Sequence, residues 1–266
     1  MEKPRKSTSR GVGRQKVRGH SPANRSLQRG IEILRAFRPG SEVLGNGDIA
    51  ERTGLSRATV SRLTQTLVGA GYLERDTALR AYRLGAPVLS LSHSMRSGSS
   101  LLAVATPLML ETAMAHKINV GLAVRDRDEM VYLESVRYSA RASLRKVVSG
   151  QRVPIELTSL GRAWLAVTSA AERDGFIAHV RLKRTQHWPQ LKVELERAIA
   201  SVRRYGYCMA TWQPEVVALA TPIVIEGRLV CILNASLTTT VRPQEVVAAL
   251  KNPLLELAKR IALAAR

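Results

Sequence analysis

Residues 48–70 constrain the fold of this chain more than any other segment. They read DIAERTGLSRATVSRLTQTLVGA, with helical periodicity on both sides of the tetrapeptide Thr53-Gly54-Leu55-Ser56. Gly suits the residue that ends one helix, and Ser suits the N-cap of the next. The pattern therefore predicts a short helix over 48–52, a tight turn, and a longer helix from Arg57 to about Ala70.

The longer helix has one apolar face and one polar face. Val60, Leu63 and Leu67 fall on the same side at about 100° per residue, and the far side is small, polar or cationic. The helix contains no Asp or Glu, so its polar face can approach a phosphate-lined groove without repulsion. Any exposed helix face is polar, but most mix Glu with Lys, so we favour DNA binding. Arg62 and Gln65 could donate to guanine and adenine edges.

The flanking segments extend this pattern. Leu27, Ile31, Leu34 and Phe37 recur at helical spacing and predict an amphipathic helix over 26–37. Two short alternating runs at 71–75 and 80–84 predict a β-hairpin. Three helices followed by a basic hairpin is the order of a winged helix-turn-helix, in which the third helix enters the major groove and the wing follows the backbone. The predicted DNA-binding residues are Ser56, Arg57, Ala58, Thr59, Ser61, Arg62, Gln65, Arg75, Arg80 and Arg83.

The charge balance also favours a polyanionic partner. The 266 residues carry 41 Lys and Arg against 21 Asp and Glu, a net charge of +20. The first 25 residues hold eight Lys or Arg and a single acid, Glu2, so we expect residues 1–23 to form a flexible basic arm, although a solubilising tail would have the same composition. With no apolar run of membrane-span length and no signal peptide, a cytoplasmic protein without a membrane partner is expected.

Nothing in the sequence predicts a metal or a cofactor. Cys208 and Cys231 lie in separate apolar segments, outside any CxxC pattern, and the five His residues show no HExxH motif. We expect both thiols to be buried as small apolar groups.

Several longer motifs resemble a known family. SLQRGIEIL from Ser26, DIAERTGLSRATVSRL from Asp48 and GYLER from Gly71 closely resemble the IclR-type bacterial transcriptional regulators. The resemblance continues with TSLGRAWLA from Thr158 and ATPIVI from Ala220, and it covers roughly residues 24–262. It implies a winged helix-turn-helix domain, a linker helix and a GAF-like effector-binding domain, in a homodimer or a dimer of dimers. We expect these parts over residues 24–84, 85–100 and 101–266.

The second domain has its own pattern of alternating strands and helices, which indicates an α+β fold with an antiparallel sheet. A helix over 101–116 contains Pro107, which either starts a second segment or kinks the first. The other predicted elements are strands at 120–124, 130–135 and 143–148, a turn at 149–152, helices at 159–167, 171–180 and 191–205, a hairpin of 216–225 with 229–237, and a helix at 244–265.

A ligand site is predicted at one helix start. Thr158 and Ser159 precede Leu160 and Gly161, where free backbone N–H groups could cradle a carboxylate, although Thr158 could equally be an ordinary N-cap. The resemblance implies that this loop borders the effector cavity, and that the opposite wall holds Leu144, Cys208, Asn234 and Ser236. The chain departs from the family by reading CMATWQPEVVA from Cys208. We therefore expect a rather apolar pocket, with Met209 and Trp212, that suits an aromatic or hydrophobic small carboxylate better than a two- or three-carbon one.

These observations favour a transcriptional regulator, either a repressor or an activator, whose binding to double-stranded operator DNA is modulated by a small-molecule effector. A nonspecific chromosomal DNA-binding protein would need the same charge but no pocket domain. An enzyme in the C-terminal domain is the other alternative, but no GxSxG motif, His/Asp pair or nucleotide loop supports catalysis. We expect no enzymatic activity and no cofactor.

Overall fold

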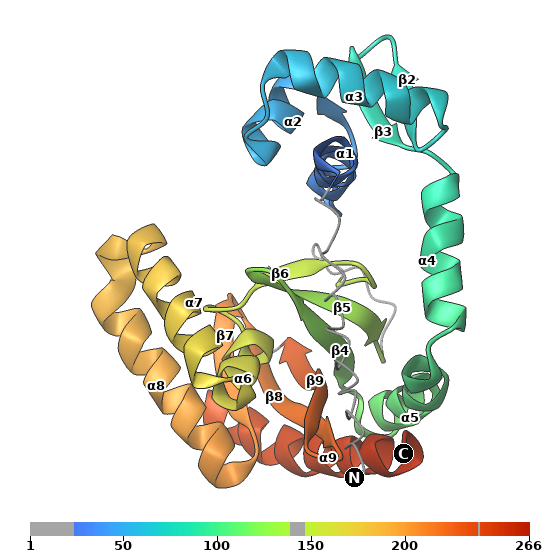
Figure 1. The fold of residues 1–266 in the computed structure, drawn as a ribbon. Coiled ribbons are helices and arrows are strands. Elements are labelled where there is room, and N and C mark those ends of the chain that lie inside the picture. The colour runs from blue at the N-terminus through green and yellow to red at the C-terminus, as the bar shows by residue number, and fades with distance from the viewer. Residues whose placement is uncertain (1–23, 139–146, 239) are drawn as a thin grey trace, which may run out of the picture.

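The computed structural model describes residues 24–138, 147–238 and 240–266. The N-terminal part is a winged helix-turn-helix, as predicted (Figure 1). Its three short strands form an antiparallel sheet in the order β1-β3-β2. The elements are α1 (Arg25–Ala36), β1 (Leu44–Gly45), α2 (Asn46–Thr53), α3 (Arg57–Gly69), β2 (Leu73–Asp76) and β3 (Ala81–Leu84).

The turn between α2 and α3 forms as its residue types predict. Gly54 ends α2 in the left-handed region at φ 68°, and its N–H donates to the carbonyl of Ala50. The Ser56 side chain accepts from the backbone N–H of Thr59 and caps α3. Because both ends are set by local hydrogen bonds, the angle between the two helices follows from the turn itself.

The buried face of α1 differs from the prediction. Leu27 and Ile31 are 63% and 45% exposed, whereas Ile33 is fully buried and Phe37 nearly so. Only the C-terminal end of α1 packs into the small apolar core, together with Ile49. Helical periodicity identifies an apolar stripe but not how much of it the neighbouring elements reach.

Helix α4 (Pro87–Ser97) leads from this unit to the C-terminal part (Figure 1). It contains no buried residue. Helix α5 (Ser100–His116) follows and continues through Pro107. None of the helices in the described ranges is by itself long and apolar enough to cross a membrane, although α4 and α5, which are bent by 83°, would meet that criterion as a pair.

The C-terminal part is a six-stranded antiparallel sheet in the order β6-β5-β4-β9-β8-β7. Helices α5 and α9 cover one face, and α6, α7 and α8 cover the other (Figure 1). The strands are β4 (Asn119–Asp126), β5 (Glu129–Val136), β6 (Arg152–Pro154), β7 (Cys208–Gln213), β8 (Val216–Ile225) and β9 (Arg228–Thr238). The helices are α6 (Ser159–Val167), α7 (Ala170–Lys183), α8 (Trp188–Tyr205) and α9 (Pro243–Ala264), with a short 3-10 turn at Thr185–His187.

Both edge strands depart from the prediction. Of the strand expected at 143–148, residues 143–146 lie outside the described residues, and Val147 and Val148 are not in a strand. The edge strand is instead β6, which begins at Arg152, where a turn was expected. At the other edge, β7 was not predicted, although its buried residues Cys208 and Ala210 alternate with the exposed residues Met209 and Thr211. Edge strands take their conformation from a neighbour, so local patterns predict them poorly.

Candidate functional site

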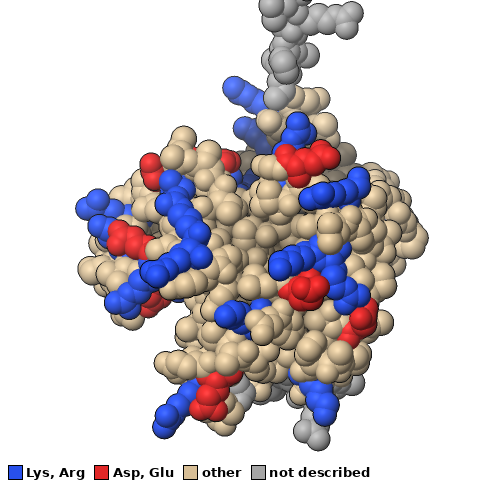
Figure 2. Space-filling view, turned by 90° about the horizontal axis from the view of Figure 1, so that it is seen from below, with Lys and Arg blue, Asp and Glu red and all other residues tan. Residues whose placement is uncertain are grey.

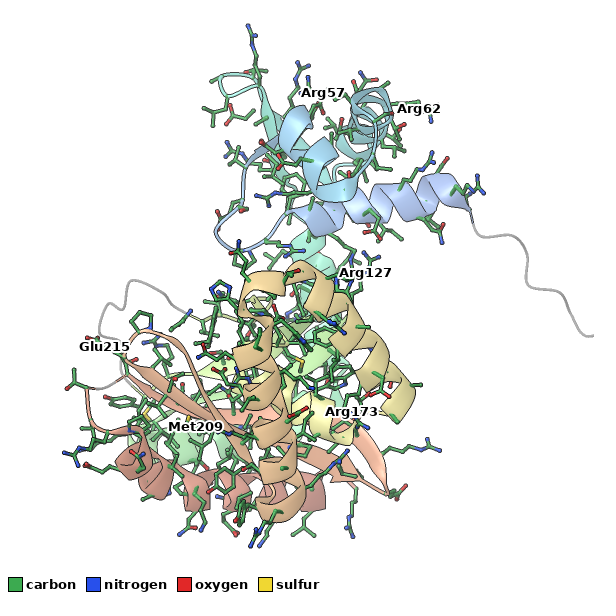
Figure 3. All side chains as sticks on the ribbon, turned by 90° about the vertical axis from the view of Figure 1, so that its left-hand side faces the viewer. Arg57, Arg62, Arg127, Arg173, Met209 and Glu215 are labelled. Carbon is green, nitrogen blue, oxygen red and sulfur yellow. The ribbon has the colours of Figure 1, made fainter. Side chains whose placement is uncertain are left out.

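One face of α3 is exposed in the part of the chain that the structure describes. Arg57, Ala58, Arg62 and Gln65 are exposed, and Ser61 is half-buried. Val60 and Thr64 on the opposite side are buried, and the Thr64 hydroxyl donates to the carbonyl of Val60 at 2.9 Å. In Figure 3, Arg57 and Arg62 lie at the end of the molecule away from the C-terminal sheet.

Neither arginine has an ion-pair partner among the described residues. Helix α3 contains no acidic residue that could neutralise them. Ser56 and Thr59 lie at the N-terminus of this helix, where their hydroxyls share a hydrogen bond of 2.9 Å. The face therefore combines two unpaired guanidinium groups with the positive end of a helix dipole, which suits an anionic partner.

The wing presents its arginines unequally. Arg75 and Arg80 are exposed, and Arg80 lies in the turn with φ 49°. Arg83 instead forms an ion pair with Asp76 of the same hairpin. The backbone N–H of Leu79 also donates to Asp76, and this hydrogen bond, with the help of Arg83, holds the pKa of that carboxyl below its usual value. Arg83 is thus partly neutralised before it meets any ligand.

Elsewhere on the surface the charges are mixed. On the face seen from below Figure 1, which includes α9, Lys and Arg side chains alternate with Asp and Glu (Figure 2). One exposed pair on this part of the chain joins Arg260 of α9 to Glu111 of α5, with both guanidinium nitrogens donating. The cations of α3, without acidic partners among the described residues, contrast with this surface of mixed charge.

A cavity of about 500 Å³ lies on the α6 face of the large sheet. Its floor comes from β4, β5 and β9, which contribute Gly121, Tyr132 and Asn234. Arg137 and Glu215 belong to its lining from the loops beyond β5 and before β8. Figure 3 shows Glu215 at the margin of the C-terminal part. The volume suits a small organic molecule.

The floor of the cavity holds an unsatisfied acceptor. Asn234 is only 6% exposed, and its Oδ1 is buried without a hydrogen-bond partner among the described residues. Its Nδ2 donates to the Tyr132 hydroxyl at 3.5 Å, and burial raises the pKa of Tyr132 to about 12, so the phenol stays neutral. A buried acceptor without a donor costs about 1–3 kcal/mol, which a ligand that donates could recover.

Glycine is required opposite that acceptor. Gly121 pairs with Asn234 across β4 and β9. A Cβ at this position would lie 2.4 Å from Asn234 Oδ1 and 2.4 Å from the Tyr132 ring. Any larger residue would force these side chains to move, so glycine is what allows Asn234 and Tyr132 to pack this closely against β4.

The residues predicted for the ligand site separate into two groups. Asn234 and Ser236 line the cavity, and Leu144 lies outside the described residues. The other predicted residues are buried around the start of α6, and they are not among the described residues that line the cavity. They are Thr158, Ser159, Leu160, Gly161 and Cys208.

Their polar groups are used within the fold. The Thr158 hydroxyl donates to the carbonyl of Pro154 at 2.8 Å and accepts from the N–H of Gly161. The Cys208 thiol donates to the carbonyl of Ser159. Burial raises the pKa of this thiol to about 12, and that of the buried Cys231 likewise. The start of α6 therefore has the geometry of an ordinary N-cap.

Met209 and Trp212 are not in this cavity, contrary to the expectation. They line a separate hollow beside β7 with Arg162 and Ser201. Sequence reasoning in turn missed Gly121 and Tyr132. The available signal was the polar pair Asn234 and Ser236 within an apolar strand, but the residues facing them depend on the register between β4 and β9. Within the described residues, no three His, Cys, Asp or Glu side chains group closely enough to hold a metal ion.

Comparison with known families gives two matches that together span most of the chain. Residues 26–77 match the IclR helix-turn-helix domain, and residues 93–263 match the C-terminal domain described as bacterial transcriptional regulator IclR C-terminal.

Two curated relatives are similar over most of the chain. The transcriptional regulator TsaQ1/TsaQ2 of Comamonas testosteroni is 38% identical over 70% of this chain and 66% of its own length. The p-hydroxybenzoate hydroxylase transcriptional activator of Acinetobacter baylyi is 29% identical over 83% of this chain and 84% of its own length.

Solved structures share the fold. An IclR family regulator from Brucella abortus has a TM-score of 0.82 at 35% identity, over 92% of this chain and 94% of its own. An IclR homologue from Microbacterium hydrocarbonoxydans, solved as a complex with 4-hydroxybenzoate, has a TM-score of 0.66 at 24% identity, over 91% of this chain and 99% of its own.

Proposed function

Because this chain belongs to the IclR family of bacterial transcriptional regulators, we propose that it binds operator DNA through the exposed face of α3 and that a small molecule in the sheet cavity modulates this binding. The observation that carries the proposal is a pair of arginines on an acid-free helix, without ion-pair partners among the described residues and at the end of the molecule away from the C-terminal sheet. A helix of this kind fits the major groove, and the wing cations Arg75 and Arg80 would contact the adjacent backbone.

The cavity favours a hydroxylated aromatic carboxylate. Arg137 has no partner among the described residues and could bind a carboxylate. Asn234 Oδ1 requires a donor such as a hydroxyl group. The Tyr132 ring, which packs against Gly121 and belongs to the cavity lining, could contact a ligand ring. The ligand of the Microbacterium homologue, 4-hydroxybenzoate, has this combination of groups and is a suitable probe.

We further propose that the protein acts as a homodimer or a dimer of dimers. Helix α4 buries none of its residues, and Leu89, Leu91 and Met95 are exposed on it. Two winged helices would then meet two half-sites, so that a ligand that alters their separation changes DNA affinity. We assign residues 24–84 to DNA binding, 85–100 to the linker and 101–266 to the effector. Residues 1–23, the proposed basic arm, lie outside the described residues.

Footprinting of the DNA that flanks the gene tests this function. We expect a discrete protected site at protein concentrations that leave random duplex unbound, and a changed affinity for it with 4-hydroxybenzoate but not with succinate. Equal affinity for every duplex would instead favour a nonspecific chromosomal protein. If chromatography showed that the purified protein converts 4-hydroxybenzoate to a product, the result would favour an enzyme.

A further inference from the structure

The turn between β4 and β5 contacts the DNA-binding unit of the same chain. Arg127 lies at its tip with φ 57°, and both of its terminal nitrogens donate to the carboxylate of Glu32 on α1, one of them at 2.6 Å. Figure 3 places Arg127 at the boundary between the two parts of the molecule. A bidentate Arg–carboxylate pair defines orientation as well as distance.

Two more ion pairs flank this contact. Arg35 of α1 donates to Asp126 at 2.5 Å, and Arg38 just beyond α1 donates to Glu129 at 2.9 Å. Asp126 and Glu129 also bind Arg152 of β6, each at 2.7 Å. We call these five side chains, together with Glu32 and Arg127, the interdomain network.

Arg152 pre-orders the acids. Its side chain is only 17% exposed, and it holds both carboxylates on the sheet side before α1 approaches. Partial burial opposes the ionisation of Asp126, but Arg35 and Arg152 outweigh it and hold its pKa below the usual value. An isolated exposed pair contributes about 0–1 kcal/mol. Here Arg152 already restricts the rotamers of Asp126 and Glu129. Pairing these carboxylates with Arg35 and Arg38 therefore costs less conformational entropy than forming two isolated pairs.

Where the structure describes the chain, no apolar cluster joins its two parts. The three apolar clusters of the described residues each lie wholly within one part of the molecule. Between the parts lies a gap of about 650 Å³ that is lined mostly by charged side chains, among them Arg52 and Lys183. The placement of the DNA-binding unit therefore depends on the linker helix α4 and on charge.

We propose that the interdomain network positions the winged helix on the β4–β5 hairpin of its own chain, with Glu32 and Arg127 as positioning residues. The same hairpin lines the sheet cavity with Gly121 and Tyr132, so the network also joins the proposed ligand site to the DNA-binding unit. That last link rests on the proposed function. The positioning itself does not, and it can be measured without DNA or ligand.

Distance measurement by double electron–electron resonance tests the positioning. Spin labels are placed by Ala78→Cys on the exposed wing turn and Ala200→Cys on the exposed side of α8. Cys208 and Cys231 are buried with raised pKa values, so they stay unlabelled. Labelled protein is diluted with unlabelled protein so that only distances within one chain contribute.

In the otherwise native protein we expect a narrow distance distribution, which broadens in about 1 M KCl, where charges are screened beyond about 3 Å. Glu32→Arg and Arg127→Glu should each broaden it and shift it to longer distances at low salt. The double variant should be narrower than either single variant. Its recovery is partial, because position 32 lies near Arg35 and position 127 near Asp128.

The matched control is Arg260→Glu, which breaks a bidentate Arg–Glu pair of the same kind within the C-terminal part. It should leave the distribution unchanged, and circular dichroism checks that every variant is folded. Folded single variants with the native distribution would overturn the proposal, as would a double variant at least as broad as the single ones. If footprinting detected no protected site but the distance measurements gave the expected distributions, the result would count against the proposed function and not against the positioning.

Discussion

Arg96 of α4 donates to the carboxylate of Glu134 on β5, with 2.5 Å between Nη2 and Oε2. Its other terminal nitrogen donates to the carbonyl of Leu133 at 2.6 Å. Glu134 is only 8% exposed and also accepts from the N–H of Ser135, which lines the cavity. The exposed linker helix is thus tied to the strand that contributes to the proposed ligand site.

This pair predicts acid sensitivity. Partial burial opposes the ionisation of Glu134, but the hydrogen bonds from Arg96, Ser135 and Ser149 outweigh it, and the pKa lies below its ordinary value of 4.5. A lowered folded pKa stabilises the protein above 4.5, and this stabilisation is lost as the pH falls through the folded pKa. Glu134→Gln should therefore lower the free energy of unfolding at neutral pH, by about 1.5–3 kcal/mol if the charged hydrogen bonds are lost. On acidification, the variant should lose less stability than the unmodified protein does.

Urea unfolding followed by tryptophan fluorescence, from about pH 7 to about pH 3, measures this dependence. All three Trp residues lie in the C-terminal part, so the signal reports on that part. Glu196→Gln on the exposed side of α8 removes the same charge and should keep the pH profile of the unmodified protein. Parallel pH profiles for Glu134→Gln and the unmodified protein would contradict the prediction.

Arg62 and Arg80 should affect DNA binding differently. If Arg62 makes the proposed bidentate contact to a base edge, Arg62→Ala should reduce discrimination between the operator and random duplex by about 1–3 kcal/mol. Arg80→Ala should weaken binding to both duplexes about equally, since a phosphate contact carries no sequence information. Fluorescence anisotropy titrations with the footprinted site and a scrambled duplex compare them. An equal loss on both duplexes in Arg62→Ala would place that side chain on the backbone.

Asn234→Leu should raise the stability of the ligand-free protein while weakening ligand binding. Leu has nearly the shape of Asn and removes the unsatisfied buried acceptor, which is worth about 1–3 kcal/mol. In thermal-shift measurements, the melting temperature of the variant without ligand should exceed that of the unmodified protein. The increase in melting temperature that 4-hydroxybenzoate causes should become nearly as small as the increase caused by benzoate, which lacks the hydroxyl group. A lower melting temperature, or an undiminished preference for the hydroxylated acid, would refute this account of the cavity floor.

Gly161 should be intolerant of substitution. A Cβ there would lie 2.2 Å from the Ile155 backbone, and Gly161→Ala should cost at least about 1–3 kcal/mol through overpacking. Gly175 in α7 is the matched control, because nothing lies within 4 Å of its Cβ position, and Gly175→Ala should stabilise by roughly 0.5–1 kcal/mol. The free energies of unfolding from urea titrations compare the two variants. A neutral Gly161→Ala would show that the loop at Ile155 yields easily.

The sequence alone determined the local features of this protein. The bounds of α6, the cap at Ser56 and the turn at Gly54 follow from periodicity and from hydrogen bonds between residues a few positions apart. The acid-free face of α3 likewise needs only helical geometry. Such signals lie within one short window of sequence, so they can be interpreted without tertiary structure.

The tertiary structure decided everything that joins distant windows. Gly121 faces Asn234 only through the register of β4 and β9, and Arg127 reaches Glu32 only because the hairpin turn meets α1. The exposure of Leu27 depends on how far the neighbouring helices extend. Strand register and charge pairing are set by the packing of the whole chain, because many partners are locally equivalent and only the assembled fold selects one.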